Sequence, residues 1–185
     1  MSSSSDRPQR RDAAQNRDRL VDAAREVFAR LGHEAPLEEV ARAADVSRTT
    51  LYRHFATREH LALVIFEDNV ARIEERAAQL RDAPGGLRQL VDFILDMQYE
   101  NRSMWVVLSG ADLDWLTALN ARTVAAVSTL AETARAESLL HDDVGVGEVM
   151  LAFPMAAGAL GDVRGAEHTR DQVRGMVHRA LFRRS

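Results

Sequence analysis

PLEEVARAADVSRTTLYRHF, residues 36–55, is the stretch that decides the fold of this chain. The apolar residues of its first half, at three- and four-residue spacing, are Leu37, Val40, Ala41 and Ala44. This spacing predicts a helix with one buried side, and a corner is expected at Asp45. Ser47 is suited to cap a second helix, in which Leu51 and Phe55 form the buried side. The pattern is typical of two short helices joined by a tight turn, the unit that enters a DNA groove.

The exposed side of the second helix carries groups that bond nucleic acid. They are Arg48, Thr49, Thr50, Tyr52, Arg53 and His54. Guanidinium, hydroxyl, phenol and imidazole groups bond phosphate oxygens and base edges. The predicted contacts to base edges or thymine methyl groups come from Arg48, Thr49, Thr50 and Tyr52. The predicted phosphate contacts come from Ser47, Arg53 and His54. On the motif alone, a packed helix pair with a solvated polar face is the alternative.

The segment from Asn16 to Leu61 resembles the N-terminal DNA-binding domain of the tetracycline-repressor (TetR) family throughout. The similar elements are a first helix with the pattern LVDAAREVFARLG, the helix-turn-helix, the TLYRHF recognition helix and the Thr-Arg-Glu start of a fourth helix at Thr57. The resemblance implies a dimeric, all-helical transcriptional regulator. Such regulators are usually repressors that leave their operator when a small molecule binds the C-terminal domain.

Two positions depart from the family pattern. Where many members carry Thr-Thr at the start of the second helix, this chain has Ala35-Pro36-Leu37 followed by Glu38 and Glu39. The glutamates suit the positive end of a helix, but they repel phosphate. The Lys common early in the fourth helix is Arg58 here, which keeps the charge. We therefore expect a phosphate contact from Arg58.

The chain as a whole predicts an all-α protein of about nine helices. Residues 1–15 read as a flexible Ser/Arg-rich tail, and residues 16–60 as a three-helix helix-turn-helix DNA-binding domain with its motif at 36–55. Residues 61–185 are expected to form a C-terminal helical domain for ligand binding and dimerisation.

Charge is segregated along the chain, which carries a formal net charge of -4. Between Arg42 and Arg58 there are four arginines and one acidic residue, Asp45. From residue 61 onward there are 13 arginines and 18 acidic residues. The acidity therefore belongs to the distal part, and the predicted DNA-binding segment is locally basic, as an electrostatic footprint requires.

Composition and motifs argue against several other classes. The chain has no cysteine, so disulfides and thiolate metal sites are excluded. The polar N-terminus and the absence of a long apolar run predict a soluble, cytoplasmic protein without a membrane span. Its six histidines lack metal-ligand spacing, and no catalytic motif is present. We therefore expect no cofactor, no metal and no enzymatic activity.

Two C-terminal helices, at about residues 148–160 and 169–183, are the expected homodimer interface. The first is rich in small residues and the second begins with Thr169 and Gln172 in capping-box spacing. Two helices from each subunit can form a four-helix bundle about a twofold axis. The alternative is that both helices belong to the core of the monomer.

Apolar and aromatic residues with a few polar groups predict a small-molecule cavity in the C-terminal domain. The candidate ligand-binding residues are Phe66, Phe93, Met97, Met104, Trp105, Asp112 and Trp115. Ordinary core packing is the alternative for each apolar residue, and capping of a helix is the alternative for Asp112.

The sequence thus predicts a homodimeric repressor that a small-molecule effector releases from a double-stranded, pseudo-palindromic DNA operator. One alternative is an orphan DNA-binding regulator without an effector. Another is a helical small-molecule-binding or enzymatic domain whose recognition motif is vestigial.

Overall fold

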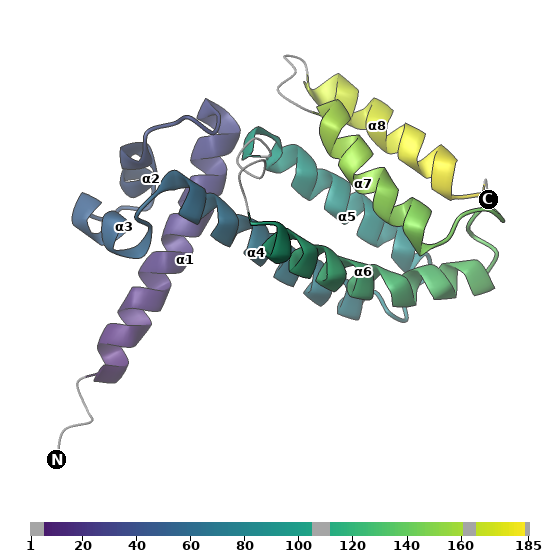
Figure 1. Ribbon diagram of the computed structural model, residues 1–185, viewed down its shortest axis with the longest axis horizontal. Coiled ribbons are helices and arrows are strands. Elements are labelled where there is room, and N and C mark those ends of the chain that lie inside the picture. The colour runs from purple at the N-terminus through teal and green to yellow at the C-terminus, as the bar shows by residue number, and fades with distance from the viewer. Residues whose placement is uncertain (1–5, 105–111, 161–165, 184–185) are drawn as a thin grey trace.

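The computed structural model describes residues 6–104, 112–160 and 166–183, and these form eight helices (Figure 1). Their bounds are α1 (Asp6–Leu31), α2 (Leu37–Ala43), α3 (Arg48–His54), α4 (Arg58–Gln79), α5 (Gly86–Glu100), α6 (Leu113–Ala136), α7 (Val146–Leu160) and α8 (Ala166–Leu181). The all-α prediction is confirmed. The sequence predicts about nine helices, and the eight found here leave out residues 105–111, which lie outside the described residues.

The helices build two hydrophobic cores that share α4. The first core joins α1, α2 and α3 to the N-terminal half of α4, which contributes Leu61, Ile65 and Phe66. The second core joins α5 to α8 with the C-terminal half of α4, from Ile73 to Ala77. In Figure 1, α4 runs from the α1–α3 group and continues behind α6. One continuous helix therefore belongs to both parts of the molecule.

The corner between α2 and α3 is closed by backbone hydrogen bonds. The N–H of Val46 donates to Ala41 O at 3.0 Å, and the N–H of Asp45 donates to Arg42 O at 3.2 Å. This pair of bonds is a Schellman motif, which needs a left-handed residue at its centre. Asp45 supplies it with φ of 53°, a conformation that Asp tolerates better than most residues. The predicted corner is thereby fixed by local geometry.

The predicted flexible tail, residues 1–15, is helical from Asp6 onward, so that prediction is wrong for most of its length. Residues 6–19 are dominated by Arg, Ala, Gln and Asp and contain no glycine. Pro8 lies in the first turn, where its missing N–H costs no intrahelical bond. Helix propensity and continuity with the buried part of α1 therefore extend the helix through a polar sequence.

The last helix also begins earlier than the capping-box pattern indicates. Because α8 starts at Ala166, Thr169 and Gln172 lie inside the helix and do not cap it. Near its C-terminus α8 makes an isolated antiparallel bridge between Phe182 and Leu140 of the loop after α6.

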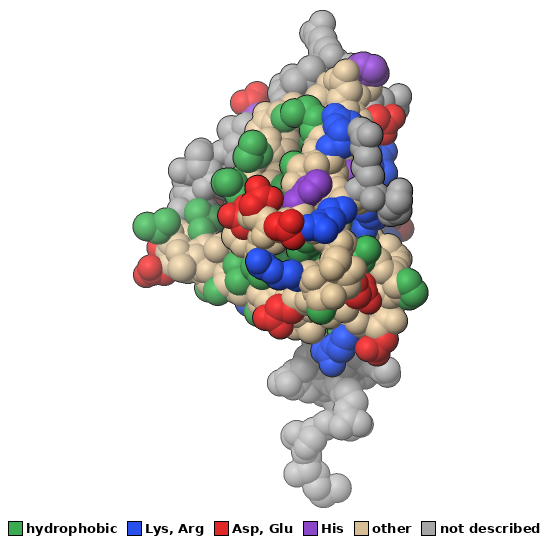
Figure 2. All heavy atoms as spheres, turned by 90° about the vertical axis from the view of Figure 1, so that its right-hand side faces the viewer, with side chains coloured by type: hydrophobic (Ala, Val, Ile, Leu, Met, Phe, Trp, Pro, Cys, Tyr) green, Lys and Arg blue, Asp and Glu red, His purple; other side chains and the backbone are tan. Residues whose placement is uncertain are grey.

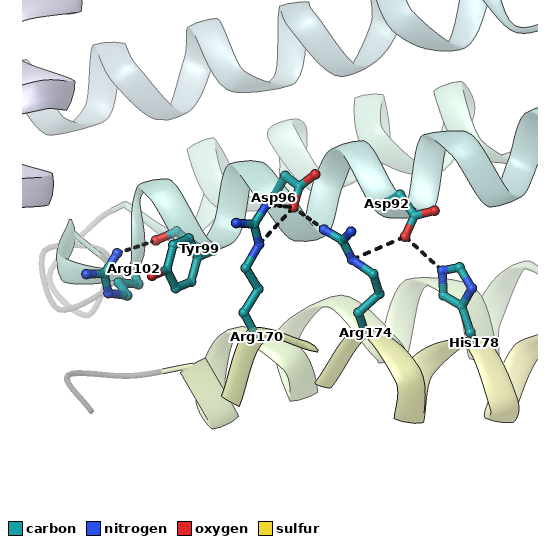
Figure 3. Close-up of polar contacts among 7 residues, drawn as sticks. All are labelled: Asp92, Asp96, Tyr99, Arg102, Arg170, Arg174 and His178. Carbon is teal, nitrogen blue, oxygen red and sulfur yellow. Dashed lines mark hydrogen bonds and ion pairs between the residues drawn. The ribbon is translucent and has the colours of Figure 1, made fainter. Parts of the chain in front are cut away.

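A ladder of charged side chains fastens α8 to α5 (Figure 3). Arg170 and Arg174 both pair with Asp96, and His178 Nε2 lies 2.8 Å from Asp92 Oδ1. The α8 members are spaced four residues apart, as are the two aspartates on α5, so both sets lie on one helix face. The ladder fixes the rotation of α8 about its own axis.

The end of the molecule farthest from α1–α3 shows acidic, basic and hydrophobic side chains intermixed (Figure 2). The described side chains at this end do not form a continuous basic surface of the kind that DNA binding requires. Within the described ranges, each helix is either too short or too polar to cross a lipid bilayer.

Replacing Leu51 with Ala tests the first core. Leu51 is fully buried, so Leu51→Ala should lower the free energy of unfolding by about 3 kcal/mol through lost burial and a cavity. Urea denaturation followed by circular dichroism measures this change. Leu113→Ala is the control, because Leu113 is 75% exposed. Equal effects of the two substitutions would contradict the assigned core.

Candidate nucleic-acid interface and internal cavity

The N-terminus of α3 is organised by Ser47. Its Oγ accepts a hydrogen bond from the Thr50 N–H at 3.1 Å and lies 2.9 Å from Thr50 Oγ1. This arrangement is the cap that the sequence predicts. Both hydroxyl groups therefore help to define the start of α3, in addition to the DNA contacts predicted for them.

Four exposed side chains of α3 form a surface that we call the recognition face. They are Arg48, Thr49, Tyr52 and Arg53. On the opposite side Leu51 is fully buried, and Phe55 directly after the helix is 1% exposed. Burial of one side thus fixes which side chains point outward. The recognition face combines two guanidinium groups with two hydroxyl-bearing side chains, the chemistry used for phosphate and base contacts.

Two members of the recognition face are held by a carboxylate on α2. Glu38 Oε1 accepts hydrogen bonds from Arg48 Nη2 at 2.5 Å and from the Tyr52 hydroxyl at 3.2 Å. The neighbouring Glu39 turns elsewhere and pairs with Arg42 at 2.9 Å. Sequence reasoning noted both glutamates as unfavourable for phosphate but missed the pairing of Glu38 across the turn.

Two of the predicted phosphate ligands, His54 and Arg58, are less accessible than the recognition face. His54 is half-buried, and burial, with Arg53 and Arg17 adding to the effect, lowers the pKa of its imidazole. Its ring is therefore neutral at pH 7. Arg58 Nε is buried, and neither it nor His54 Nε2 has a hydrogen-bond partner among the described residues. These two nitrogens are the polar groups here that stay unsatisfied.

A cavity of about 290 Å³ lies among α4, α5, α6 and α7. Its lining residues are Phe66, Asn69, Val70, Ile73, Ile94, Met97, Gln98, Asn101, Trp115, Leu116, Leu119, Asn120, Thr123, Met150, Phe153 and Pro154. Phe66 is also part of the first core, and Trp115 and Leu119 pack against that core. The cavity wall is therefore shared with the helix-turn-helix domain.

The polar groups of the cavity are amides rather than charges. Asn69, Gln98 and Asn101 are buried and line it, and its remaining polar lining residues are Asn120 and Thr123. Asn101 donates to Met97 O at 2.7 Å, while Gln98 Oε1 has no partner among the described residues. A cavity of this kind suits an uncharged, mainly apolar molecule.

The structure brings only part of the predicted ligand set together. Phe66, Met97 and Trp115 line the cavity, whereas Phe93, Met104 and Asp112 do not, and Trp105 lies outside the described residues.

Each of the three misplaced residues has another role. Phe93 lies under the guanidinium of Arg72, and Met104, at 1% exposure, belongs to the first core. Asp112 caps α6 by accepting the Trp115 N–H at 2.9 Å, the alternative that the sequence left open. One of the cavity amides that sequence reasoning missed, Asn69, could have been recognised from its spacing. Asn69 falls at an apolar helical position of α4, three residues after Phe66 and four before Ile73.

A guanidinium from α1 reaches the cavity wall. Arg25 donates to Asn69 Oδ1 on α4 at 2.5 Å. It also pairs at 2.5 Å with Asp68, which precedes Asn69 on α4. Burial is the main effect on Arg25 and lowers the pKa of its guanidinium, which Asp68 opposes. After α5, the hydroxyl of Ser103 donates to Phe28 O at 2.8 Å. The cavity region and α1 are thus joined by two sets of hydrogen bonds.

In the described part of the chain, three or more His, Asp or Glu side chains nowhere converge in a manner that could hold a metal ion.

Comparison with known proteins matches this architecture to one family. Residues 20–65 match the model of the bacterial regulatory proteins of the tetR family. The HTH-type transcriptional repressor NicS of Pseudomonas putida is 26% identical over 146 residues, which are 71% of this chain and 69% of the relative.

Two solved structures resemble the whole fold. A TetR transcriptional regulator from Streptomyces coelicolor has a TM-score of 0.70 and 25% identity, over 91% of this chain and 99% of that chain. A TetR transcription regulatory protein from Mycobacterium vanbaalenii has a TM-score of 0.67 and 28% identity, over 95% of this chain and 100% of that chain. Residues 20–65 thus match the tetR family, the whole fold agrees with that of TetR regulators, and the protein is a DNA-binding transcriptional regulator.

Proposed function

We propose that the protein is a homodimeric repressor that binds a pseudo-palindromic operator and leaves it when a small molecule occupies the cavity. The observation that carries this proposal is the shared wall. Phe66, Trp115 and Leu119 contact both the cavity and the first core. A ligand that displaces these side chains must also disturb the packing beneath the recognition helix, because a close-packed core transmits strain.

Each protomer places one α3 in the major groove, with base contacts from Arg48, Thr49 and Tyr52 of the recognition face. For two half-sites read from one side of the duplex, the two α3 helices lie about one helical turn, roughly 34 Å, apart. Arg53 and Arg58 are assigned to phosphate. His54 acts as a neutral hydrogen-bonding group, because burial lowers the pKa of its imidazole.

The proposed effector is uncharged, mainly apolar and able to form hydrogen bonds. The described residues that line the cavity carry no charge, and the Arg25 guanidinium behind Asn69 is already paired with Asp68. This supports an uncharged ligand, since an ionised one would be buried without a free counter-charge. The cavity volume, 290 Å³, is about twice that of an apolar protein cavity that takes one benzene, roughly 150 Å³. A molecule of two small rings matches this volume.

Asn69 and Arg25 are the proposed link from the cavity to α1. A ligand that hydrogen-bonds to Asn69 competes with the Arg25 guanidinium for the same oxygen. Arg25 has only 16% of its side chain exposed, so a lost bond is not readily replaced by water. The preferred position of α1 on α4 then changes, and the helix-turn-helix domain moves with it.

The outer faces of α7 and α8 are the proposed dimer interface. Leu151 and Met155 on α7 and Met176 on α8 are 58%, 66% and 63% exposed. Small residues beside them, Gly158 and Ala180, permit close approach of helices. The ladder to α5 occupies the inner side of α8 and leaves this apolar side outward.

Selection of binding sites from a random duplex library tests the DNA-binding proposal, and two variants divide its contacts. Arg48→Ala should reduce the ratio of operator to random-duplex affinity by about tenfold, as expected for loss of a base contact. Arg58→Ala should weaken both affinities equally and reduce the salt slope by about one. Fluorescence anisotropy at several salt concentrations measures both. Recovery of no preferred sequence would indicate a vestigial recognition motif, and equal behaviour of the two variants would contradict the assignment.

Asn69→Leu tests the link to the cavity, with Asn120→Leu as the matched control on α6. Uncharged one- and two-ring aromatic molecules that raise the melting temperature of the protein should weaken operator binding at least about tenfold. In Asn69→Leu these molecules should still bind, but their effect on operator affinity should fall to less than about threefold, while Asn120→Leu keeps the full effect. If no molecule raised the melting temperature, or if both variants responded fully, the effector proposal would be wrong.

Charged residues at the proposed interface should separate the subunits. Met155→Glu combined with Met176→Glu should convert the dimer to monomer, because four carboxylates would have to be buried per dimer. Sedimentation velocity measures the mass, and operator affinity should fall in parallel. Leu113→Glu, an equally exposed apolar position on α6, should leave the dimer intact. A wild-type protein that sediments as a monomer would rule out this interface.

A further inference from the structure

Glu38 is the carboxylate that touches the recognition face. It lies in the first turn of α2, across the corner from α3, and accepts bonds from Arg48 and Tyr52 on a single oxygen. Arg48 is 70% exposed at its side chain, whereas Glu38 is 34% exposed. The carboxylate is therefore the more fixed partner, and the guanidinium is the one that can leave.

Local structure keeps Glu38 charged and in place. A hydrogen bond from its own backbone N–H is the main cause that lowers the pKa of its carboxyl, and Arg48 and Tyr52 lower it further. A negative charge in the first turn also suits the positive end of α2. At neutral pH, Glu38 thus presents a full negative charge beside two groups assigned to DNA.

We propose that Glu38 is a specificity-determining residue, which holds Arg48 and Tyr52 in one paired arrangement and weakens their contacts with phosphate. This inference rests on the proposed DNA contacts of the recognition face. On a random duplex, binding is mainly to phosphate, and Arg48 must break its ion pair to take part. The carboxylate itself also repels the backbone. Non-specific binding is therefore weakened.

On the operator the balance differs. Arg48 bonds a base edge there, and the hydroxyl of Tyr52, still held by Glu38, keeps its ring oriented. Loss of the carboxylate would remove repulsion but would also free two side chains that must then be ordered on binding. These effects oppose one another at the operator, whereas on random DNA the loss of repulsion and the release of Arg48 both strengthen binding. Glu38 thus increases the difference between the two affinities.

The experiment compares Glu38→Gln with Glu39→Gln in the full chain. Both variants remove one charge from the same turn of α2, and each frees one arginine, Arg48 or Arg42. Only Glu38 touches the recognition face, so the general effect of charge is matched. The affinities are measured for the selected operator and for a random duplex of equal length, with thermal melts to establish that each variant is folded.

Glu38→Gln should raise random-duplex affinity about fivefold, because Arg48 no longer has to break an ion pair to reach phosphate, and steepen the salt slope by about 0.9, the effect of one added phosphate contact. Operator affinity should change less than about twofold, so discrimination falls. Glu39→Gln should change both affinities by one common factor. The inference is overturned if Glu38→Gln leaves discrimination unchanged, or if Glu39→Gln reduces it equally.

An Arg48→Ala background separates this inference from the proposed operator function. There, adding Glu38→Gln should increase random-duplex affinity no more than adding Glu39→Gln does, because no guanidinium is released at α3. This comparison needs no operator. A wild-type protein that selects no sequence would refute the proposed function, while a fivefold gain that persists without Arg48 would refute the role given to Glu38.

Discussion

The whole molecule depends on α4 belonging to two cores at once. Its first turns pack under the helix-turn-helix through Leu61 and Ile65, and its later turns pack under α5 and α6 through Ile73 and Ala77. At 22 residues it spans about 33 Å without a hinge residue. Neither end can shift without moving side chains in the other core. The cavity lies where this helix passes from one core to the other, so an occupant would meet both.

Local signals made the helix-turn-helix predictable from sequence. Ser47 caps α3 and Leu51 is its buried residue, both read directly from spacing and residue type. The corner at Asp45 also agreed, although its left-handed conformation could not be read from an Asp. The N-terminal tail was misjudged because composition describes solubility, while helix continuation depends on propensity and on a neighbouring nucleus. Local sequence patterns therefore predicted which helices form more accurately than where those helices begin and end.

Pairs that join distant elements were beyond sequence reasoning. Arg25 and Asn69 are 44 residues apart, and their contact depends on the register between α1 and α4. Glu38 and Arg48 are only ten apart, yet their pairing depends on the angle at the corner. Met104 shows the opposite error, because it was expected to line the cavity and instead packs in the first core. An apolar residue near an expected cavity is equally suited to the adjoining core. The relative placement of two helices is set by tertiary packing, and the sequence pattern of a single helix does not determine it.

The ladder between α5 and α8 bears on which chains can associate. Apolar packing alone would allow α8 to rotate about its axis against α5. The pairing of Asp92 and Asp96 on α5 with Arg174 and His178 on α8 selects one rotation. In the proposed dimer, that rotation decides which stripe of α8 meets the second subunit. A paralogue with another order of charges on its own helix pair would turn a different stripe outward and match this one poorly. The order of the paired side chains between α5 and α8, which lie away from the proposed dimer interface, would then prevent this regulator from forming mixed dimers with its relatives.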